Sequence, residues 1–326
     1  MKKKLMSLVV IAFAIISIIA FIVSTRLQND NVLLRYAYIP SALVDAPSAI
    51  SQEAFSKYGI NAKPFSTGIE TVQALIGNAT DVATLAEWPF LLASQKKNDL
   101  RILAIISNAK SMGMVANKEK GINTVSDLVG KIVGFPQGTS AQFVYETLVS
   151  KAGIKNKVKT INLTPPNLIP SMMRGDIDAM VVWQPFLEKA LQKKPDSFHL
   201  IPGSQDVLRV IYFVVSTESY IQKNPKGIKK LLKILIEADK KLKNRNAEAL
   251  SILSSKTNID IKTLNKLLPL FDYNVKIDST IVNTFKRLSV WAAKSGLAKK
   301  EILTTDWSQF IYPKLLKELE PENVKY

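Results

Sequence analysis

The sequence contains no cysteine and a single histidine, His199. Without cysteine the chain can form no disulfide, offers no thiol nucleophile and lacks the thiolate ligands of most structural zinc sites. One histidine cannot make a clustered histidine site, so we expect neither a metal nor a cofactor. The absence of cysteine also excludes attachment to a membrane through a lipidated N-terminal cysteine. Any membrane attachment must therefore be made by the polypeptide itself.

Acidic residues are also few, with 27 Asp and Glu against 44 Lys and Arg, which gives a formal charge of +17. Such a surplus is typical of nucleic-acid-binding proteins. The densest lysines, however, lie in residues 223–245, where they alternate with leucine and isoleucine at helical spacing. This pattern predicts a helix with a solvated basic face, and contact with anionic lipid or the gathering of anions are the functional alternatives. We expect no nucleic-acid partner.

The N-terminus begins with three lysines at positions 2–4, and residues 5–23 then form an uncharged, mostly apolar run before Arg26. Such a run spans about 28 Å as a helix, close to the hydrocarbon thickness of a bilayer. The lysines place the N-terminus in the cytoplasm and the rest of the chain outside. The run ends in Ser24 and Thr25, which make a poor cleavage site. An uncleaved anchor is therefore favoured over a cleaved signal peptide, and a buried core helix is the third alternative.

The chain is long and apolar enough for about two domains, with 326 residues of which 47% are hydrophobic. Short apolar runs alternate with stretches of helical spacing, such as residues 69–76, 141–151 and 168–173. Strands that alternate with helices predict a parallel, doubly wound α/β sheet. The predicted strands are residues 32–38, 82–85, 102–106, 131–135, 158–163 and 179–182. Beyond Asn224 the sequence predicts helices only.

Two segments resemble each other. The first has GNATDVA at residues 77–83 and WPFL at residues 88–91, and the second has GDIDA at residues 175–179 and WQPFL at residues 183–187. Both predict a helix that ends in glycine, an aspartate that enters a buried strand, and a loop closed by Pro-Phe-Leu. Two lobes of similar build would produce this repeat, although such αβ units are common enough to recur by chance.

Further turns lie around these segments: STG at residues 66–68, PQGTSA at residues 136–141 and TPPN at residues 164–167. In this order, from about residue 32 to 216, the chain resembles the periplasmic binding proteins for nitrate, sulfonates, taurine and thiamine precursors. The resemblance implies the type II periplasmic-binding-protein fold, with two doubly wound lobes that close on a ligand. It also implies the extracytoplasmic solute-binding component of an ABC importer, whose partners are a small-molecule ligand and the permease subunits.

The resemblance divides the chain into four parts. Residues 1–28 are the signal anchor or signal peptide, residues 29–115 the first part of lobe 1, and residues 116–210 lobe 2. Residues 211–326 return to lobe 1 and add C-terminal helices. The two crossings, near residues 113–118 and 210–215, would act as hinges.

The ligand site is expected between the lobes, at loops that follow parallel strands and at the helix N-termini nearby. Two turns there offer hydroxyls and free backbone N–H groups, namely Ser66-Thr67-Gly68 and Gly138-Thr139-Ser140. Each turn can cradle a sulfonate, carboxylate or phosphate, or can simply cap its helix. The other polar candidates are Tyr38, Ser41, Asn167, Gln184 and Tyr212.

Two tryptophans and one glutamate complete the predicted site. Trp88 and Trp183 lie in loops of the two similar segments, where they could stack on a planar ligand or pack into the core. Glu87 would repel a simple anion and would suit a ligand with an amine, unless it is a surface residue or a partner of Arg209. The solute itself is left open between amine-bearing or heteroaromatic and sulfonate- or nitrate-like compounds.

Two other functional classes compete with a transport receptor. A hydrolase would need a nucleophile and a base, and the lone His199 lies in a strand-like segment without a nucleophile elbow. An enzyme of the same fold acting on a thiamine-precursor pyrimidine remains an alternative, as does a membrane-anchored ligand sensor. The sequence favours a non-enzymatic solute-binding protein on the outer face of the cytoplasmic membrane, in the periplasm or extracellular space, anchored by residues 5–23.

Overall fold

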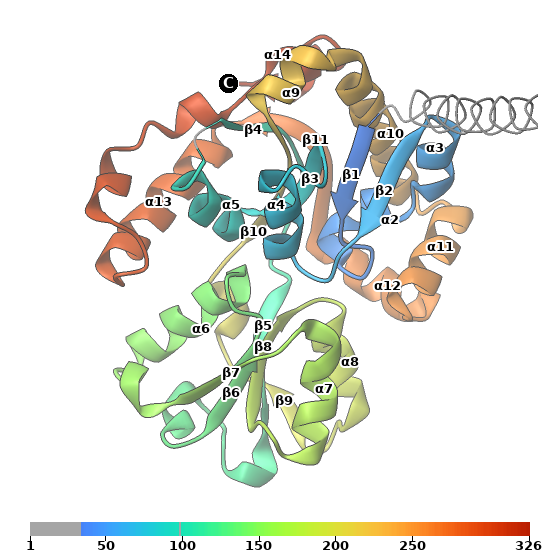
Figure 1. Cartoon of the computed structure of the whole chain (residues 1–326). Helices are drawn as coiled ribbons and strands as arrows, with labels where there is room; N and C mark the ends of the chain where they lie inside the picture. The colour runs from blue at the N-terminus through green and yellow to red at the C-terminus, as the bar shows by residue number, and fades with distance from the viewer. Residues whose placement is uncertain (1–33, 98) are drawn as a thin grey trace, which may run out of the picture.

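The computed structural model describes residues 34–97 and 99–326, and shows two lobes, each built on its own β-sheet (Figure 1). This confirms the predicted two-lobed α/β fold. The predicted anchor, residues 5–23, lies outside the described residues. Within the described part of the chain, no helix combines the length and the apolar character needed to cross a membrane.

Lobe 1 contains a seven-stranded sheet in the order β12-β11-β4-β10-β3-β1-β2. Its strands are β1 (Leu34–Tyr38), β2 (Ile60–Pro64), β3 (Val82–Ala86), β4 (Leu100–Ala109), β10 (Val210–Thr217), β11 (Phe271–Asp278) and β12 (Val324–Lys325). β1 lies parallel to β3, as predicted, and also to β2, which the sequence did not predict, whereas β10 is antiparallel to both β3 and β4. The sheet is therefore mixed, because β10 and β11 both run antiparallel to β4, which lies between them.

Lobe 2 contains a five-stranded sheet in the order β7-β6-β8-β5-β9. Its strands are β5 (Met112–Asn117), β6 (Ile132–Phe135), β7 (Lys159–Asn162), β8 (Ala179–Trp183) and β9 (Phe198–Leu200). β6 is parallel to β7 and β8, and β5 is antiparallel to β8 and β9. His199 lies in β9, where it pairs with Ala116 of β5.

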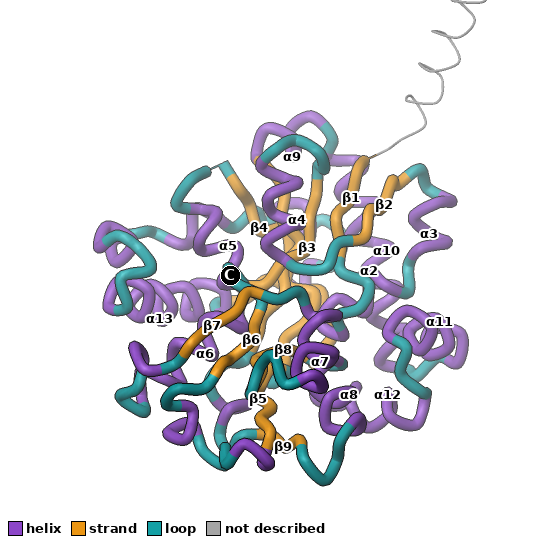
Figure 2. Tube along the Cα trace, turned by 60° about the horizontal axis from the view of Figure 1, so that its bottom comes forward, coloured by secondary structure: helices purple, strands orange, loops and turns teal. Residues whose placement is uncertain are grey.

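Helices surround both sheets, as the tube view shows (Figure 2). Lobe 2 carries α6 (Ser140–Lys151), α7 (Pro165–Arg174) and α8 (Phe186–Lys193). The first part of lobe 1 carries the 3-10 helix η1 (Leu43–Asp45), α2 (Ala46–Ala49), α3 (Gln52–Lys57), α4 (Gly68–Ile76) and α5 (Glu87–Ser94). The return to lobe 1 adds α9 (Glu218–Lys223), α10 (Pro225–Lys243), α11 (Ala247–Thr257), α12 (Ile261–Leu267), α13 (Thr280–Lys294) and α14 (Lys314–Lys317).

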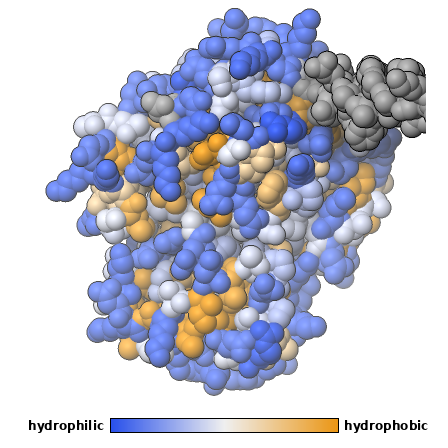
Figure 3. All heavy atoms as spheres, viewed as in Figure 1, coloured by the Kyte–Doolittle hydropathy of each residue, from blue (hydrophilic) through white to orange (hydrophobic). Residues whose placement is uncertain are grey.

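The lysine-rich segment forms α10, an amphipathic helix as predicted. Its leucines and isoleucines are buried, whereas Lys226, Lys233 and Lys240 are exposed. Several of its lysines form ion pairs, such as Lys229 with Glu318 at 2.9 Å. In the view of Figure 3 both lobes present a mostly hydrophilic surface.

The internal sequence similarity corresponds to equivalent units, α4-β3-α5 in lobe 1 and α7-β8-α8 in lobe 2. β3 and β8 are completely buried and of equal length. In each unit the aspartate before the strand accepts a backbone N–H from the neighbouring strand: Asp81 from Arg35 at 2.8 Å, and Asp178 from Ile132 at 2.9 Å. The repeated aspartate thus aligns two adjacent parallel strands, which explains its place in both halves.

The prediction of helices alone beyond Asn224 is wrong, because β11 and β12 lie in that region. Residues 271–278 alternate perfectly between buried and more exposed side chains, with Phe271, Tyr273, Val275 and Ile277 buried. This period of two is the signature of a strand with one covered face. The intervening Asp272, Asn274 and Lys276 are poor strand formers, and they obscured the pattern.

The chain crosses between the lobes twice. β4 ends at Ala109 in lobe 1 and β5 begins at Met112 in lobe 2, and β10 returns to lobe 1 at Val210. Ala109 and Val210 are directly paired in the antiparallel ladder of β4 and β10. The two crossings therefore lie side by side. The predicted hinge segments at residues 113–118 and 210–215 lie almost entirely within strands β5 and β10.

Candidate functional site

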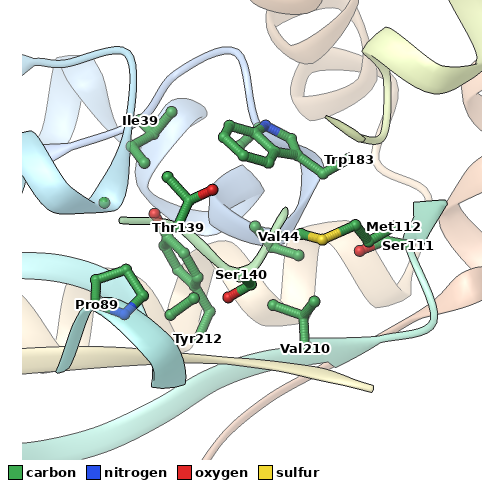
Figure 4. A pocket seen from close by; sticks show the side chains of 13 residues that line it. Ile39, Val44, Pro89, Ser111, Met112, Thr139, Ser140, Trp183, Val210 and Tyr212 are labelled. Atoms are coloured by element: carbon green, nitrogen blue, oxygen red, sulfur yellow. The ribbon is translucent and has the colours of Figure 1, made fainter. Parts of the chain in front are cut away.

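A cavity lies between the two lobes, close to the crossings (Figure 4). Its volume is about 30 Å³, which is room for about one or two water molecules. Lobe 1 contributes residues that follow β1 and β3, and lobe 2 contributes the start of α6 and the end of β8. The lining residues are Ile39, Ala42, Val44, Gly68, Ala86, Pro89, Ser111, Met112, Thr139, Ser140, Trp183, Val210 and Tyr212.

Three polar atoms on this wall are buried and have no hydrogen-bond partner among residues 34–97 and 99–326: the Ser111 hydroxyl, the Trp183 indole N–H and the Tyr212 hydroxyl. Their residues are at most 7% exposed. A buried polar group without a partner costs about 1–3 kcal/mol, so such groups usually have a role. Burial raises the pKa of Tyr212 well above its usual value, which keeps the phenol neutral and able to donate. The cavity therefore presents three uncharged groups, each able to donate a hydrogen bond to a ligand.

The N-termini of three helices meet at the same cavity. Gly68 begins α4, Ala86 precedes α5 and Ser140 begins α6, and all three residues line the wall. Helix N-termini carry partial positive charge and free N–H groups, which favour a negatively charged or strongly polar ligand group. No lining residue is charged. The walls thus combine polar donors with an apolar surface from residues such as Met112 and Val210.

Glu87 lies behind the cavity wall, where it forms hydrogen bonds with residues of α6 in lobe 2 and of strand β10. Its side chain is completely buried. The Ser140 hydroxyl donates to Glu87 Oε1 at 2.8 Å, and the backbone N–H of Ile211 donates to Oε2 at 2.7 Å. Burial raises the pKa of Glu87 to about 7. Both alternatives to a ligand role are wrong. Glu87 is not a surface glutamate, because its side chain is buried, and it is not a partner of Arg209, because the Arg209 side chain bonds Asn108 instead.

A second buried carboxyl, Asp45, lies beside the cavity on η1. Its Oδ2 accepts hydrogen bonds from the backbone N–H of Ile39 at 2.8 Å and from the Thr84 hydroxyl at 2.5 Å, and its Oδ1 has no partner in the part of the chain that the structure describes. Burial raises the pKa of Asp45 to about 7. Both bonding partners belong to lobe 1, so Asp45 supports the wall of one lobe, whereas Glu87 connects the two.

Contacts on both sides of the cavity also join the lobes. On one side Phe143 of α6 packs between Trp88 of α5 and Trp291 of α13, with ring centroids 5.8 Å and 4.4 Å away. On the other side Lys266 of α12 pairs with Glu188 of α8 at 3.3 Å, and Lys189 donates to the Thr257 carbonyl. The lobes are therefore held in contact on either side of the cavity.

Trp88 and Trp183 do not occupy equivalent places. Trp183 is the last residue of β8 and lines the cavity, whereas Trp88 is the second residue of α5 and is only 1% exposed. The residue equivalent to Trp183 in lobe 1 is Ala86, the last residue of β3. Only Trp183 therefore lies where it could stack on a ligand in this cavity, whereas Trp88 packs into the core.

Of the residues that the sequence predicted, Gly68, Thr139, Ser140, Trp183 and Tyr212 line the cavity. Thr67 and Thr139 also act as caps, since they accept backbone N–H bonds from Glu70 and Ala141. Gly138 has a left-handed φ of 74° and lies against Ile69 of the opposite lobe.

The remaining predicted residues do not line the cavity. Tyr38 is buried and stacks on Tyr36, Ser41 is partly buried, and the backbone of Ser66 bonds the Glu70 carboxylate. The Gln184 side chain accepts the N–H of Glu188. Asn167 is exposed at the start of α7, where its amide donates to Thr164.

Sequence reasoning missed Ser111, Met112 and the apolar wall residues. Ser111 lies at the first crossing, which the sequence placed a few residues later. The short polar break Asn108-Ala109-Lys110-Ser111 between two apolar runs marks that crossing. It could have been recognised as the point where one lobe ends.

A family model described as NMT1/THI5 like matches residues 55–249, more than half of the chain. The chain belongs to this family. The match covers most of lobe 1's first part, all of lobe 2, strand β10 and the helices α9 and α10.

Curated relatives of this NMT1/THI5-like protein include a binding protein from Brucella abortus, 27% identical over 64% of this chain and 67% of the relative. The taurine-binding periplasmic protein of Escherichia coli is 25% identical over 69% of this chain and 70% of its own length. Among solved structures, the alkanesulfonate-binding protein of Xanthomonas axonopodis pv. citri bound to MOPS covers 86% of this chain and 98% of its own. It superimposes with a TM-score of 0.73 at 19% identity. These likenesses confirm the fold and the predicted family resemblance.

Proposed function

We propose that this NMT1/THI5-like protein is the extracytoplasmic solute-binding component of an ABC importer. It binds a small organic or anionic solute of the sulfonate, nitrate, taurine or thiamine-precursor class between its lobes and delivers the solute to the permease. The relatives named above, a taurine-binding and an alkanesulfonate-binding protein, support this assignment.

One observation carries the proposal. The cavity is lined by three buried donors that have no partner among the described residues, namely Ser111, Trp183 and Tyr212, and three helix N-termini also approach it. A ligand with a compact polar head would supply the missing acceptors, and its apolar part would contact Met112 and Val210. Since the cavity in its present shape has a volume of about 30 Å³, a ligand enters by the separation of the lobes.

Export and membrane attachment complete the proposal. The lysines at positions 2–4 and the apolar residues 5–23 support an N-terminal anchor that leaves both lobes on the outer side of the cytoplasmic membrane. A protein tethered in this way would remain close to its permease, and closure around the ligand would be the state that the permease recognises.

We propose a binding protein rather than an enzyme. The lining residues include no histidine, lysine or carboxylate that could exchange protons with a bound molecule. Ser140 lines the wall and donates to Glu87, but Glu87 itself does not line the cavity. Incubation of the protein with each ligand of the panel below should leave the ligand chemically unchanged in mass spectra.

The direct test is a ligand panel measured by thermal shift and by calorimetry on the full-length chain in mild detergent. The panel contains taurine, alkanesulfonates, nitrate, bicarbonate, amino acids and pyrimidine thiamine precursors. A ligand at a hundredfold its Kd adds about 2.7 kcal/mol of stability. One compound that raises the melting temperature and binds with one-to-one stoichiometry supports the proposal. A panel without any binder would contradict it and would favour a scaffold or sensor role.

Substitution of Tyr212 by phenylalanine separates ligand binding from stability. The change removes a hydroxyl that forms no hydrogen bond with the described residues, so the ligand-free chain should be as stable as the wild type or slightly more stable. The panel's binder should lose about tenfold in affinity, because one hydrogen bond is lost. Calorimetry and urea unfolding measure the two effects. Tyr273→Phe is the matched control, since the Tyr273 hydroxyl donates to the Leu43 carbonyl and its loss should lower stability instead.

A further inference from the structure

Glu87 is the residue at which the two lobes and the crossing strand meet. It is the first residue of α5 in lobe 1, and its two oxygens bond Ser140 of lobe 2 and Ile211 of β10. Separation of the lobes must therefore break the bond to Ser140 and bring water to the carboxyl. Opening of the lobes therefore changes the environment of the Glu87 carboxyl more than it changes that of a carboxyl whose hydrogen-bond partners all lie in one lobe.

We propose that closure of the two lobes takes up a proton at Glu87. The proposal rests on the proposed function in one respect, that the lobes separate to admit a ligand. It adds that the closed state binds a proton which the open state releases at neutral pH.

The charges around Glu87 support this assignment. No ion pair of Glu87 with a cation occurs within the described residues, where its contacts are hydrogen bonds to Ser140 and Ile211. The Glu87 carboxyl and the Asp45 carboxyl both act electrostatically on the phenol of Tyr212, and both raise its pKa. In closed lobes, burial without a compensating cation raises the pKa of Glu87 to about 7 from an ordinary value of 4.5.

Other ionisable side chains on the elements that pack against α5 are exposed or have partners elsewhere. On α4, Glu70 accepts the N–H of Ser66, and on α6, Glu146 pairs with Lys155 and Tyr145 stacks on Phe135. On α13 the charged residues are exposed, and they are Lys286, Arg287 and Lys294.

The protonation state of Glu87 also decides what Ser140 presents to the cavity. While Glu87 is ionised, the Ser140 hydroxyl donates to it and offers only lone pairs to the cavity. Once Glu87 is protonated, its O–H can donate to Ser140, whose own hydrogen is then free to turn toward a ligand. An anionic ligand would be repelled by an ionised Glu87, so the same proton favours both closure and anion binding.

Closure can be followed with fluorescent labels, because the chain has no native cysteine. Lys96→Cys, after α5 in lobe 1, and Lys151→Cys, at the end of α6 in lobe 2, are exposed positions for a donor and an acceptor. Energy transfer is recorded on the ligand-free, full-length chain in detergent from pH 5 to pH 8. With the two pKa values above, the closing equilibrium constant should fall on the order of 50-fold over this range.

The Glu87→Gln variant should abolish this pH dependence. Its amide cannot titrate, yet its Oε1 can accept from Ile211 and its Nε2 can donate to Ser140, which imitates the protonated acid. Asp45→Asn is the matched control, because Asp45 is equally buried but bonds lobe 1 alone, and this variant should keep the wild-type response. A wild type whose energy transfer ignores pH, or a Glu87→Gln variant that still responds, would overturn the proposal.

A second variant covers the case in which Glu87→Gln does not fold. Ser140→Ala should reduce closure more at pH 8 than at pH 5, because a hydrogen bond to an ionised carboxylate is roughly twice as strong as one to a neutral acid. A purely structural role of Ser140 would reduce closure equally at both pH values, and that result would contradict the proposal. These measurements use no ligand, so failure of the ligand panel and failure of the proton-linked closure are separate results.

Discussion

The free energy of unfolding should fall by about 2–3 kcal/mol for each of two carboxyls, Asp45 and Glu87, as the pH rises from 5 to 8. Both side chains are completely buried, and burial raises the pKa of each to about 7. Unfolding returns them to water, where their pKa values are 3.8 and 4.5. Because the folded-state pKa is the higher one, the stabilisation is complete below about pH 4 and is lost as the pH rises through about 7. Urea unfolding followed by circular dichroism measures it.

Two variants apportion this effect. In Asp45→Asn one amide oxygen can still accept from Ile39 and Thr84, and in Glu87→Gln the acceptor for Ile211 is kept, so each variant should fold. Each should remove about half of the contribution of these two carboxyls, and the double variant should keep only a smaller pH dependence from Asp239, whose pKa burial raises to about 6. A wild-type stability that rises between pH 5 and pH 8 would show that the two carboxyls are ionised in the folded protein.

Replacement of Trp88 by alanine should destabilise the protein by about 3–5 kcal/mol, the usual cost of removing a buried aromatic side chain. The ring is 1% exposed and contacts Phe143 and Trp291, at centroid distances of 5.8 Å and 5.4 Å. Chemical denaturation measures the loss. Trp88→Phe, which keeps part of the volume, should lose much less.

The same pair of variants decides between packing and ligand contact. If Trp88 stacked on the ligand, as the sequence allowed, Trp88→Ala would lose affinity without a comparable loss of stability. Val290, which is 60% exposed on α13 beside Trp291, offers a control, because Val290→Ala should change stability by no more than about 0.5 kcal/mol.

The architecture was readable from the sequence because its signals are local. The repeated Gly-to-Asp units, the turn at Gly138 to Ser140 and the lysines of α10 each depend on residues that are neighbours in the chain. Helix caps and strand entry points follow from side-chain chemistry over a few positions. These same features placed Ser140 and Trp183 at the cavity.

Features that depend on distant residues could not be read in this way. The burial of Trp88 is decided by Trp291, about two hundred positions away, and the role of Glu87 by Ile211 in a strand that returns from the other lobe. Nothing near Glu87 in the sequence distinguishes a surface carboxylate from one enclosed between two lobes. Strand β11 is a different case, because its period of two was present but was carried by residues with weak strand preference.

The pairing of Ala109 with Val210 determines how the lobes can move. The two connections are hydrogen-bonded neighbours in the middle of the lobe 1 sheet. The first connection continues into β5 of lobe 2, and the second comes from β9, the last strand of lobe 2. A two-stranded ribbon bends across its flat face more readily than it shears along its strands. The lobes should therefore open by rotation about a single axis, with little twist. The opening that admits a ligand would then widen the cavity and separate, at the same time, the contacts between the lobes on either side of it.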